Sequence, residues 1–575
     1  MKLKYAIIIS SCLGVVLMFN SCGKSFLEQT PRGVLDEQTL ATEKGINKLL
    51  LSAYAMLDGH DGGLGLGGEW GSGGSNFLYG DIGGGLANKG SSFDDQGPNM
   101  TPVQRHEVQP GNGAINDRWK AIYEGVKRTN TVMQVLAKAT VTDDVRKKLA
   151  GQARFLRAFY HFEARKIFEK VPYLDEVIDA QLAAGEISSV ANDVDIYPKI
   201  LEDAKYAWEN LPETQSAVGL VNKWSAGAFY GKVLMFSKDF ATAKTVLTDV
   251  VNNGKNSLGV KFDLNANYDD NFNVDFDNSR ESVFAFQASS KDNASARNAN
   301  WGDLLNTPAS TGGGGAGFFT PTYFFANQFK TGADGLPVAN PLNTEVFDVF
   351  GQAALTRYTG NVDTRLDWTI GRDGVPFHDW GTYLTSWPRA TDAGPYAGKK
   401  IMIRQSQVDA THDASIWFIG GGTALNMNLI RFADVILLLA EAEIEAGSLA
   451  NATALINRVR NRAKTSRVVT FPATSGTIRV EPYPATFASQ DVARKAVRLE
   501  RMLELGMEGH RFFDLVRWGI ASQELTTYIQ YETGANFTYQ AILRNPVPVY
   551  TAPSDDYYPI PQQQIDLSNG IIKQR

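Results

Sequence analysis

The chain has 575 residues, of which 43% are apolar and 21% charged, a composition typical of a folded protein with a large core. Its 56 Lys and Arg residues against 62 Asp and Glu residues give a net charge of −6. This balance does not favour nucleic-acid binding, for which a basic surface is expected.

The N-terminal residues predict that the protein is exported. Basic residues precede an apolar run at residues 5–19, and Ser21 and Cys22 follow it. A helix of this run would be only about 22 Å long, short of the roughly 30 Å hydrocarbon core of a bilayer. A basic start, a short apolar run and a small residue before the cleavage site are typical of a signal peptide, which we place at residues 1–21. An uncleaved membrane anchor is the alternative interpretation.

Cysteine usage refines this interpretation, because the only two cysteines are Cys12, inside the apolar run, and Cys22. Cleavage before Cys22 would leave one cysteine, at the first position of the mature chain, and no disulfide within it. The segment Phe19-Asn20-Ser21-Cys22 is similar to a bacterial lipobox, although Phe19 stands where leucine is usual. No later segment approaches the roughly 18 apolar residues of a membrane span. We therefore expect a lipid on Cys22, such as palmitate, to be the only membrane anchor.

After a predicted helix at about 37–57, glycine dominates the segment 60–113. The densest runs are at 62–68 and 83–85. Glycine at this density opposes regular helix, so we predict a long surface loop. Loops of this length in compact proteins are usually functional or disordered, and the aromatic residues within it, Trp70 among them, favour a functional loop.

The chain up to residue 255 is otherwise helical in pattern. Apolar residues recur at helical spacing in five segments, at 115–138, 143–170, 193–210, 222–236 and 239–252. The last two form a predicted hairpin, because small residues such as Gly231 on one helix would let Phe240 and Ala243 on the next pack closely. Such a hairpin is tetratricopeptide-like, although no strict period of about 34 residues is visible.

Residues 256–425 differ from both flanking regions. They are rich in Gly, Asn, Asp and Thr, with long loops and strand-like pieces such as 282–288. Helical patterns return in the C-terminal part, at 429–446, at 449–463 and around 492–503. A basic run at 458–467 is most simply interpreted as a solvated helix face. A proline-rich tail at 546–561 is expected to extend across the surface.

These patterns predict a mainly α protein with a few short strands. We divide the mature chain into an N-terminal helical, tetratricopeptide-like region at 22–255 and a C-terminal region at 256–575. The latter has a loop-rich middle (256–425) and a helical end (426–575).

Several motifs together resemble one family. The most specific is the run Glu508-Gly509-His510-Arg511-Phe512-Phe513-Asp514-Leu515-Val516-Arg517-Trp518-Gly519. The segments Ala153–Tyr160, Asp363–Leu366, Ile430–Val435, Ile456–Ala463 and Tyr558–Pro561 are also similar, and they follow in family order. On these residues the chain resembles the SusD/RagB family of outer-membrane nutrient-binding lipoproteins.

The resemblance implies a tetratricopeptide-like helical-hairpin scaffold with a large irregular, loop-rich, ligand-facing region. It also implies a cell-surface lipoprotein of the outer membrane that captures a glycan or, as some members do, a peptide. The implied partner is a SusC-like TonB-dependent outer-membrane transporter, to which the ligand is delivered.

The strongest motifs are expected to serve the structure instead of the ligand. Trp119 and Trp518 lie in helical patterns, where a large ring fills the gap between helices. Arg511, Asp514 and Arg517 are at helical spacing and are expected to form ion pairs.

No motif of an enzyme or of a metal site stands out. The run Gly63–Gly68 satisfies G-x-G-x-x-G but follows a helix and not a strand, so nucleotide binding is not expected. The six histidines show no paired metal spacing, and no G-x-S-x-G run is present. Residues 269–275 hint at a calcium loop but lack its glycine and its last glutamate, so a polar turn is the simpler interpretation.

We therefore expect a binding protein with no cofactor, no metal and no catalysis. The alternative is a surface hydrolase acting on an oligosaccharide or a peptide. The 62 acidic residues offer many carboxylate pairs, but no pair is set apart by the sequence around it.

Tryptophan positions indicate where a ligand would bind. Of the ten tryptophans, six fall in the loop-rich segments, namely Trp70, Trp301, Trp368, Trp380, Trp387 and Trp417. Aromatic rings offer broad apolar faces on which the C–H faces of sugars can stack, and loops commonly carry binding residues. The predicted ligand-binding residues are Trp70, Trp301, Trp380, Tyr383 and Trp387. For any one ring taken alone, a role in the core is the simpler interpretation, so the prediction rests on the set.

Overall fold

The computed structural model describes residues 40–59, 70–293, 298–310, 314–389, 393–416, 421–472, 475–537, 539 and 541–575. The predicted signal peptide and Cys22 lie outside these residues. Within the described ranges, no helix combines the length and the apolar character needed to cross a membrane.

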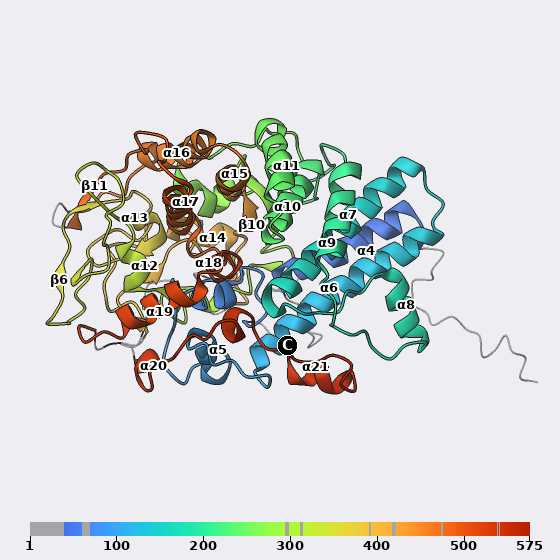
Figure 1. Ribbon diagram of the computed structural model, residues 1–575, viewed down its shortest axis with the longest axis horizontal. Helices are drawn as coiled ribbons and strands as arrows, with labels where there is room; N and C mark the ends of the chain where they lie inside the picture. The colour runs from blue at the N-terminus through green and yellow to red at the C-terminus, as the bar shows by residue number, and fades with distance from the viewer. Residues whose placement is uncertain are drawn as a thin grey trace, which may run out of the picture.

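Helices that pack against their neighbours in sequence make up the N-terminal half (Figure 1). They are α4 (Glu43–Ala55), α5 (Gly97–Gln104), α6 (Gly113–Lys138), α7 (Asp143–Phe168), α8 (Glu176–Ala184), α9 (Tyr197–Asn210), α10 (Lys223–Phe236) and α11 (Phe240–Asn253). Side chains fix where the long helices begin: Asn112 caps α6 and Thr142 caps α7 by accepting from backbone N–H groups. The predicted hairpin is confirmed as α10 and α11. A Cβ on Gly231 would lie only 2.4 Å from Leu247, so the close approach needs glycine.

The C-terminal half combines short strands with a second helical group. Its helices are α12 (Tyr323–Asn327), α13 (Leu366–Thr369), α14 (Val408–Thr411), α15 (Phe432–Ala446), α16 (Leu449–Thr465), α17 (Gln490–Leu505), α18 (Arg511–Arg517), α19 (Ala521–Glu532), α20 (Ala541–Arg544) and α21 (Gln562–Leu567). In Figure 1, α15, α16 and α17 lie between the N-terminal helices and the irregular region that contains α12 and α13. The prediction of a mainly helical fold is confirmed.

The strands of the described residues are few and short. They are β1 (Ala87–Gly90), β2 (Ser282–Phe286), β3 (Phe318–Pro321), β4 (Lys330–Thr331), β5 (Glu345–Val346), β6 (Thr356–Arg357), β7 (Asn361–Val362), β8 (Ile370–Gly371), β9 (Ala397–Gly398), β10 (Met427–Arg431) and β11 (Thr477–Ile478). The predicted strand at 282–288 is confirmed as β2, which pairs antiparallel with β10. The predicted helix start at 429 is wrong, because pairing with β2 holds Met427–Arg431 extended and α15 begins only at Phe432.

The glycine-rich segment departs most from the prediction. Its residues 71–91 are buried and form a π-helix (η2, Phe77–Ile82) and strand β1, so the prediction of a surface loop is wrong for this part. The glycines serve close contact between backbones. A Cβ on Gly80 would lie 2.0 Å from the carbonyl oxygen of Gly509, and a Cβ on Gly71 would lie 2.7 Å from the Cα of Ala114.

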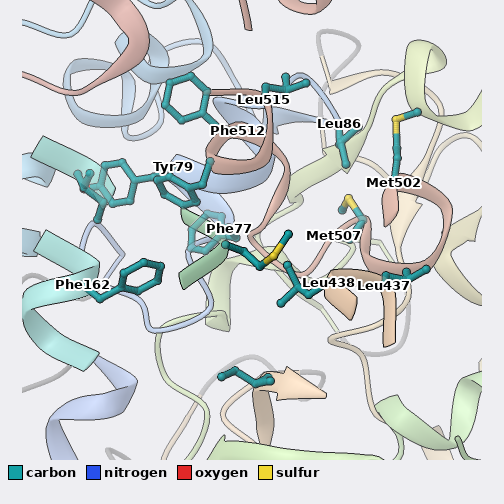
Figure 2. Close-up of a cluster of buried hydrophobic side chains, with 14 of the residues drawn as sticks. Phe77, Tyr79, Leu86, Phe162, Leu437, Leu438, Met502, Met507, Phe512 and Leu515 are labelled. Carbon is teal, nitrogen blue, oxygen red and sulfur yellow. The ribbon is translucent and has the colours of Figure 1, made fainter. Parts of the chain in front are cut away.

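This buried segment joins the two halves of the molecule. Figure 2 shows its Phe77 and Tyr79 in one apolar cluster with Phe162 of α7 and Phe512 of α18. The tail adds Tyr558, whose hydroxyl donates to the carbonyl oxygen of Tyr79 at 3.2 Å. The tail is thus anchored in the core and includes the short helix α21, instead of being wholly extended across the surface as predicted.

The prediction that the basic run forms a solvated helix face is also partly wrong. Arg460 and Arg462 of α16 are buried, at 0% and 5% exposure. They belong to a continuous buried network of ion pairs, which we call the core ion network. Its cations are Arg365, Lys400, Arg431, Arg460 and Arg462, and its carboxylates are Glu281, Asp363, Glu500, Glu504 and Glu508. Five positive charges meet five negative ones, so the network is neutral, as burial of charge requires.

The family-like motif around α18 is structural, as predicted. Arg517 pairs with Asp514 at 2.8 Å, and Arg511 pairs with Glu524 of α19 at 2.9 Å. The indole N–H of Trp518 donates to Glu441 at 2.9 Å. These side chains have their partners inside the fold.

Candidate functional site

Two of the predicted aromatic residues, Trp70 and Trp301, are brought together by the fold. Their ring centroids are 6.1 Å apart and the rings are inclined by only 13°, so they are stacked. Both residues are partly exposed, and they pack on the buried side chains of Leu304 and Ile416. We call this stacked pair the tryptophan platform.

Glycine and one hydrogen bond hold the two segments of the platform in place. Gly73 and Gly302 meet backbone to backbone, since a Cβ on Gly302 would lie 2.9 Å from the Cα of Gly73. The Ser75 hydroxyl donates to Asp303 at 2.8 Å, which ties the segment after Trp70 to the segment after Trp301. Because these links join residues more than 200 positions apart, the platform is a product of the tertiary fold.

The carboxyl group of Asp303, two residues after Trp301, is buried. Burial raises its pKa from 3.8 to about 6, although hydrogen bonds from Ser75 and Asn306 oppose the shift. The raised pKa makes the protonation of this group sensitive to pH changes in the mildly acidic range.

Polar atoms that the sequence did not single out lie next to the platform. The Oδ1 atoms of Asn300 and Asn306 and the hydroxyl of Thr307 are buried and form no hydrogen bond in the part of the chain that the structure describes. Buried acceptors of this kind are usually satisfied by an ordered water or a ligand hydroxyl. Their spacing along residues 300–307 gives no sequence signal, because asparagine and threonine are common in loops.

The other three predicted residues form a separate cluster. Tyr383 is fully buried, Trp387 is 9% exposed, and both rings pack against Phe377. The Tyr383 hydroxyl donates to the carbonyl oxygen of Pro395 at 2.9 Å, and the Trp380 indole donates to that of Ile403, also at 2.9 Å. Only Trp380 keeps a partly exposed ring, so Tyr383 and Trp387 support the surface without being able to stack on a ligand in this conformation.

The remaining loop tryptophans contribute little to either cluster. The Trp368 indole donates to the carbonyl oxygen of Arg467 at 2.9 Å, and its ring stacks on His378. Trp417 lies outside the described residues. The two clusters are linked through the loop after Trp301, because the backbone N–H of Ser310 donates to the carbonyl oxygen of Trp387 at 3.2 Å.

Acid–base and metal chemistry have little support in the described ranges. Burial lowers the pKa of His106 to about 4 and those of His161, His378 and His510 to about 3, so these imidazoles are neutral at pH 7. Across those ranges, no group of three or more potential ligand side chains could hold a metal ion. The calcium-like run begins instead with ion pairs, from Asp269 to Arg404 at 2.8 Å and from Asp270 to Arg467.

Comparisons with known proteins agree with this architecture. The model of the SusD family matches residues 280–574, and a model described as starch-binding and associating with the outer membrane matches residues 86–235. A SusD-like protein P2 of Formosa agariphila is 25% identical over 528 residues, which cover 88% of this chain and 90% of the relative.

Solved structures show the same fold. A SusD-like protein from Bacteroides fragilis has a TM-score of 0.68 at 19% identity, over 95% of this chain and 99% of that chain. A surface glycan-binding protein A from Bacteroides thetaiotaomicron, in complex with laminarihexaose, has a TM-score of 0.64 at 20% identity, over 93% and 99% of the two chains. Since the match to residues 280–574 spans more than half of the 575 residues, this chain belongs to the SusD family, a family of binding proteins and not of enzymes.

Proposed function

We propose that the protein is a cell-surface lipoprotein that captures a glycan and delivers it to a SusC-like TonB-dependent outer-membrane transporter. Family membership supports the binding role, and the laminarihexaose complex of a protein with the same fold supports a glycan as the ligand. The proposal keeps residues 1–21 as a signal peptide and Cys22 as the lipid attachment site. It also keeps the division of the mature chain into the regions 22–255 and 256–575.

The observation that carries the proposal is the tryptophan platform. Two indole rings from distant loops stack on each other, and both residues remain partly exposed. A large apolar ring face left at the surface is costly in water and favourable against the C–H face of a sugar ring. Trp380 is a further candidate for contact, with Tyr383 and Trp387 as its support.

Calorimetric titration of the purified protein with neutral oligosaccharides of defined linkage, laminarihexaose among them, tests the proposal. We expect saturable binding to at least one glycan and no cleavage products after prolonged incubation. The variants Trp70→Ala and Trp301→Ala should each weaken binding about thirtyfold, the effect of removing a central stacking ring of about 2 kcal/mol. Their melting temperatures should stay near that of the wild type.

A matched control is Trp208→Ala on α9, which also removes a partly exposed indole. This variant should bind normally. If the platform variants bind like Trp208→Ala, the platform is not the ligand site. Binding of peptides and of no glycan would change the ligand class, and product formation that rises with protein concentration would refute the binding-only role. Recovery of a TonB-dependent barrel with the protein from detergent-solubilised outer membranes tests the proposed partner.

A further inference from the structure

A cleft of about 230 Å³ lies away from the tryptophan platform. It opens between the C-terminal ends of α7 and α10, the start of α9, helix α18 and the tail. It contains no residue of the segments 70–75 or 298–306. Its volume is below the roughly 300–1,000 Å³ typical of sites for drug-sized molecules, so it would hold one ring or one end group.

The wall of this cleft carries four cations and no carboxylate. The cationic side chains are Arg165, Lys166, Lys238 and Arg517. Four aromatic rings complete the wall, from Tyr197, Phe236, Phe513 and Tyr557. A concave surface with one sign of charge attracts ligands of the opposite sign.

The acidic groups behind the wall compensate these cations only in part. Glu163 pairs with Lys166 at 2.6 Å but also with Arg118 at 2.8 Å, so one carboxylate serves two cations. Arg165 reaches Asp195 at 3.3 Å, and that aspartate side chain is 58% exposed. Arg517 has two carboxylate partners, Asp514 and Glu441, of which Asp514 also pairs with Arg501.

Lys238 provides the least compensated charge. It is exposed at the rim of the cleft, and no ion pair to it is found in the described part of the chain. The neighbouring Asp239 is engaged in capping α11 through the backbone N–H of Thr242. An anion in the cleft would therefore meet a charge that the protein does not neutralise.

The rings hold the cations in position and leave ring surface for a ligand. The guanidinium of Arg165 lies between Tyr197 and Tyr557, at 4.5 and 5.6 Å from the ring centroids. The ammonium of Lys166 lies 4.2 Å from the centroid of Phe513. Tyr197 and Tyr557 remain partly exposed, so a bound ring could contact an aromatic edge and a cation together.

We propose that this cleft binds an anionic sugar residue, such as a uronate, at a site separate from the tryptophan platform. The carboxylate would accept hydrogen bonds from Arg165 and Lys238, and the sugar ring would pack against Tyr197 and Tyr557. Charge alone would suit inorganic anions or acidic peptides equally well. The aromatic walls and the single-ring volume favour a sugar, because they add contacts that a small inorganic anion cannot use.

The test is calorimetric titration of the purified protein with trigalacturonate, a neutral trisaccharide, sulfate and a diaspartate peptide, at low and high salt. Each titration is repeated on the double variant Trp70→Ala/Trp301→Ala, which removes the tryptophan platform. We expect trigalacturonate to bind both proteins equally and more weakly at high salt. On the double variant it should bind at least tenfold tighter than any of the other ligands. Failure of the platform proposal would leave this result unchanged, because the double variant reports on the cleft alone.

Two variants locate the site. Lys238→Gln and Arg165→Gln should each weaken trigalacturonate binding about tenfold, the effect of losing one charge-assisted hydrogen bond. Lys238 has a φ of 65°, a strained conformation that glutamine would share, so the exchange leaves the backbone cost unchanged. The control Lys199→Gln removes an exposed cation from α9 outside the cleft and should have no effect.

Three results would overturn the proposal. The first is equal affinity for trigalacturonate and the neutral trisaccharide on the double variant. The second is an affinity for sulfate or for a diaspartate peptide equal to that for trigalacturonate, which would show that the cleft binds anions without specificity. The third is equal binding by Lys238→Gln and Lys199→Gln.

Discussion

Removing one carboxylate from the core ion network should destabilise the protein strongly. Glu504 is fully buried and contacts three cations: Arg365 at 2.9 Å, Arg431 at 2.6 Å, and Arg462. Glu504→Gln keeps the shape of the side chain but leaves the network with one positive charge in excess. Breaking a buried ion pair by removing one partner costs about 3–5 kcal/mol, so we expect a loss of that size in the free energy of unfolding.

Denaturant titration followed by circular dichroism measures this loss. The control is Glu445→Gln, which breaks a 2.7 Å ion pair with Arg494 at the surface and should cost only about 0–1 kcal/mol. The double variant Glu504→Gln/Arg462→Gln restores neutrality and should lose less than the sum of the two single changes. Equal costs for Glu504→Gln and Glu445→Gln, or strict additivity in the double variant, would refute the reasoning.

Three further predictions concern other parts of the chain. Gly80→Ala places a methyl group 2.0 Å from a backbone oxygen and should lower the unfolding free energy by about 3 kcal/mol, whereas Gly97→Ala, with open space around it, should be nearly neutral; thermal denaturation compares them. The raised pKa of Asp303 means that its contribution to stability is complete below its unfolded pKa and is lost as pH rises through about 6. Asp303→Asn should therefore gain stability relative to the wild type between pH 4 and pH 7, by up to about 3 kcal/mol, and equal pH profiles of the two unfolding free energies would contradict this. Cys22→Ser should release the protein from the membrane fraction and abolish labelling by a radioactive fatty acid, and unchanged labelling would exclude lipid attachment at this residue.

The helices could be predicted from the sequence because their signal is local. The expected boundaries of α6, α10 and α11 differ from the structure by no more than two residues. Strand β10 was missed because what makes it extended is its partner β2, about 140 residues earlier in the chain. An apolar pair such as Leu429-Ile430 fits a helix equally well until that partner is known.

The candidate site could be predicted only in part, for the same reason. Position in irregular segments correctly placed Trp70 and Trp301 outside the helices, but only the tertiary contact of Gly73 with Gly302 shows that the two rings stack. The same criterion also selected Tyr383, which the fold buries completely. Irregular backbone can line a core as well as a surface, and glycine density does not distinguish the two cases.

The burial of the glycine-rich segment has a consequence for how the chain folds. Asp81 accepts a hydrogen bond from the backbone N–H of Gly509 across 428 positions of sequence, and Tyr558 reaches Tyr79 across 479. Contacts this distant form late, because a long loop must close before they can stabilise anything. The N-terminal helices therefore cannot complete their core until the last residues of the chain have been made, and a chain truncated before residue 558 should remain a partly open, aggregation-prone intermediate.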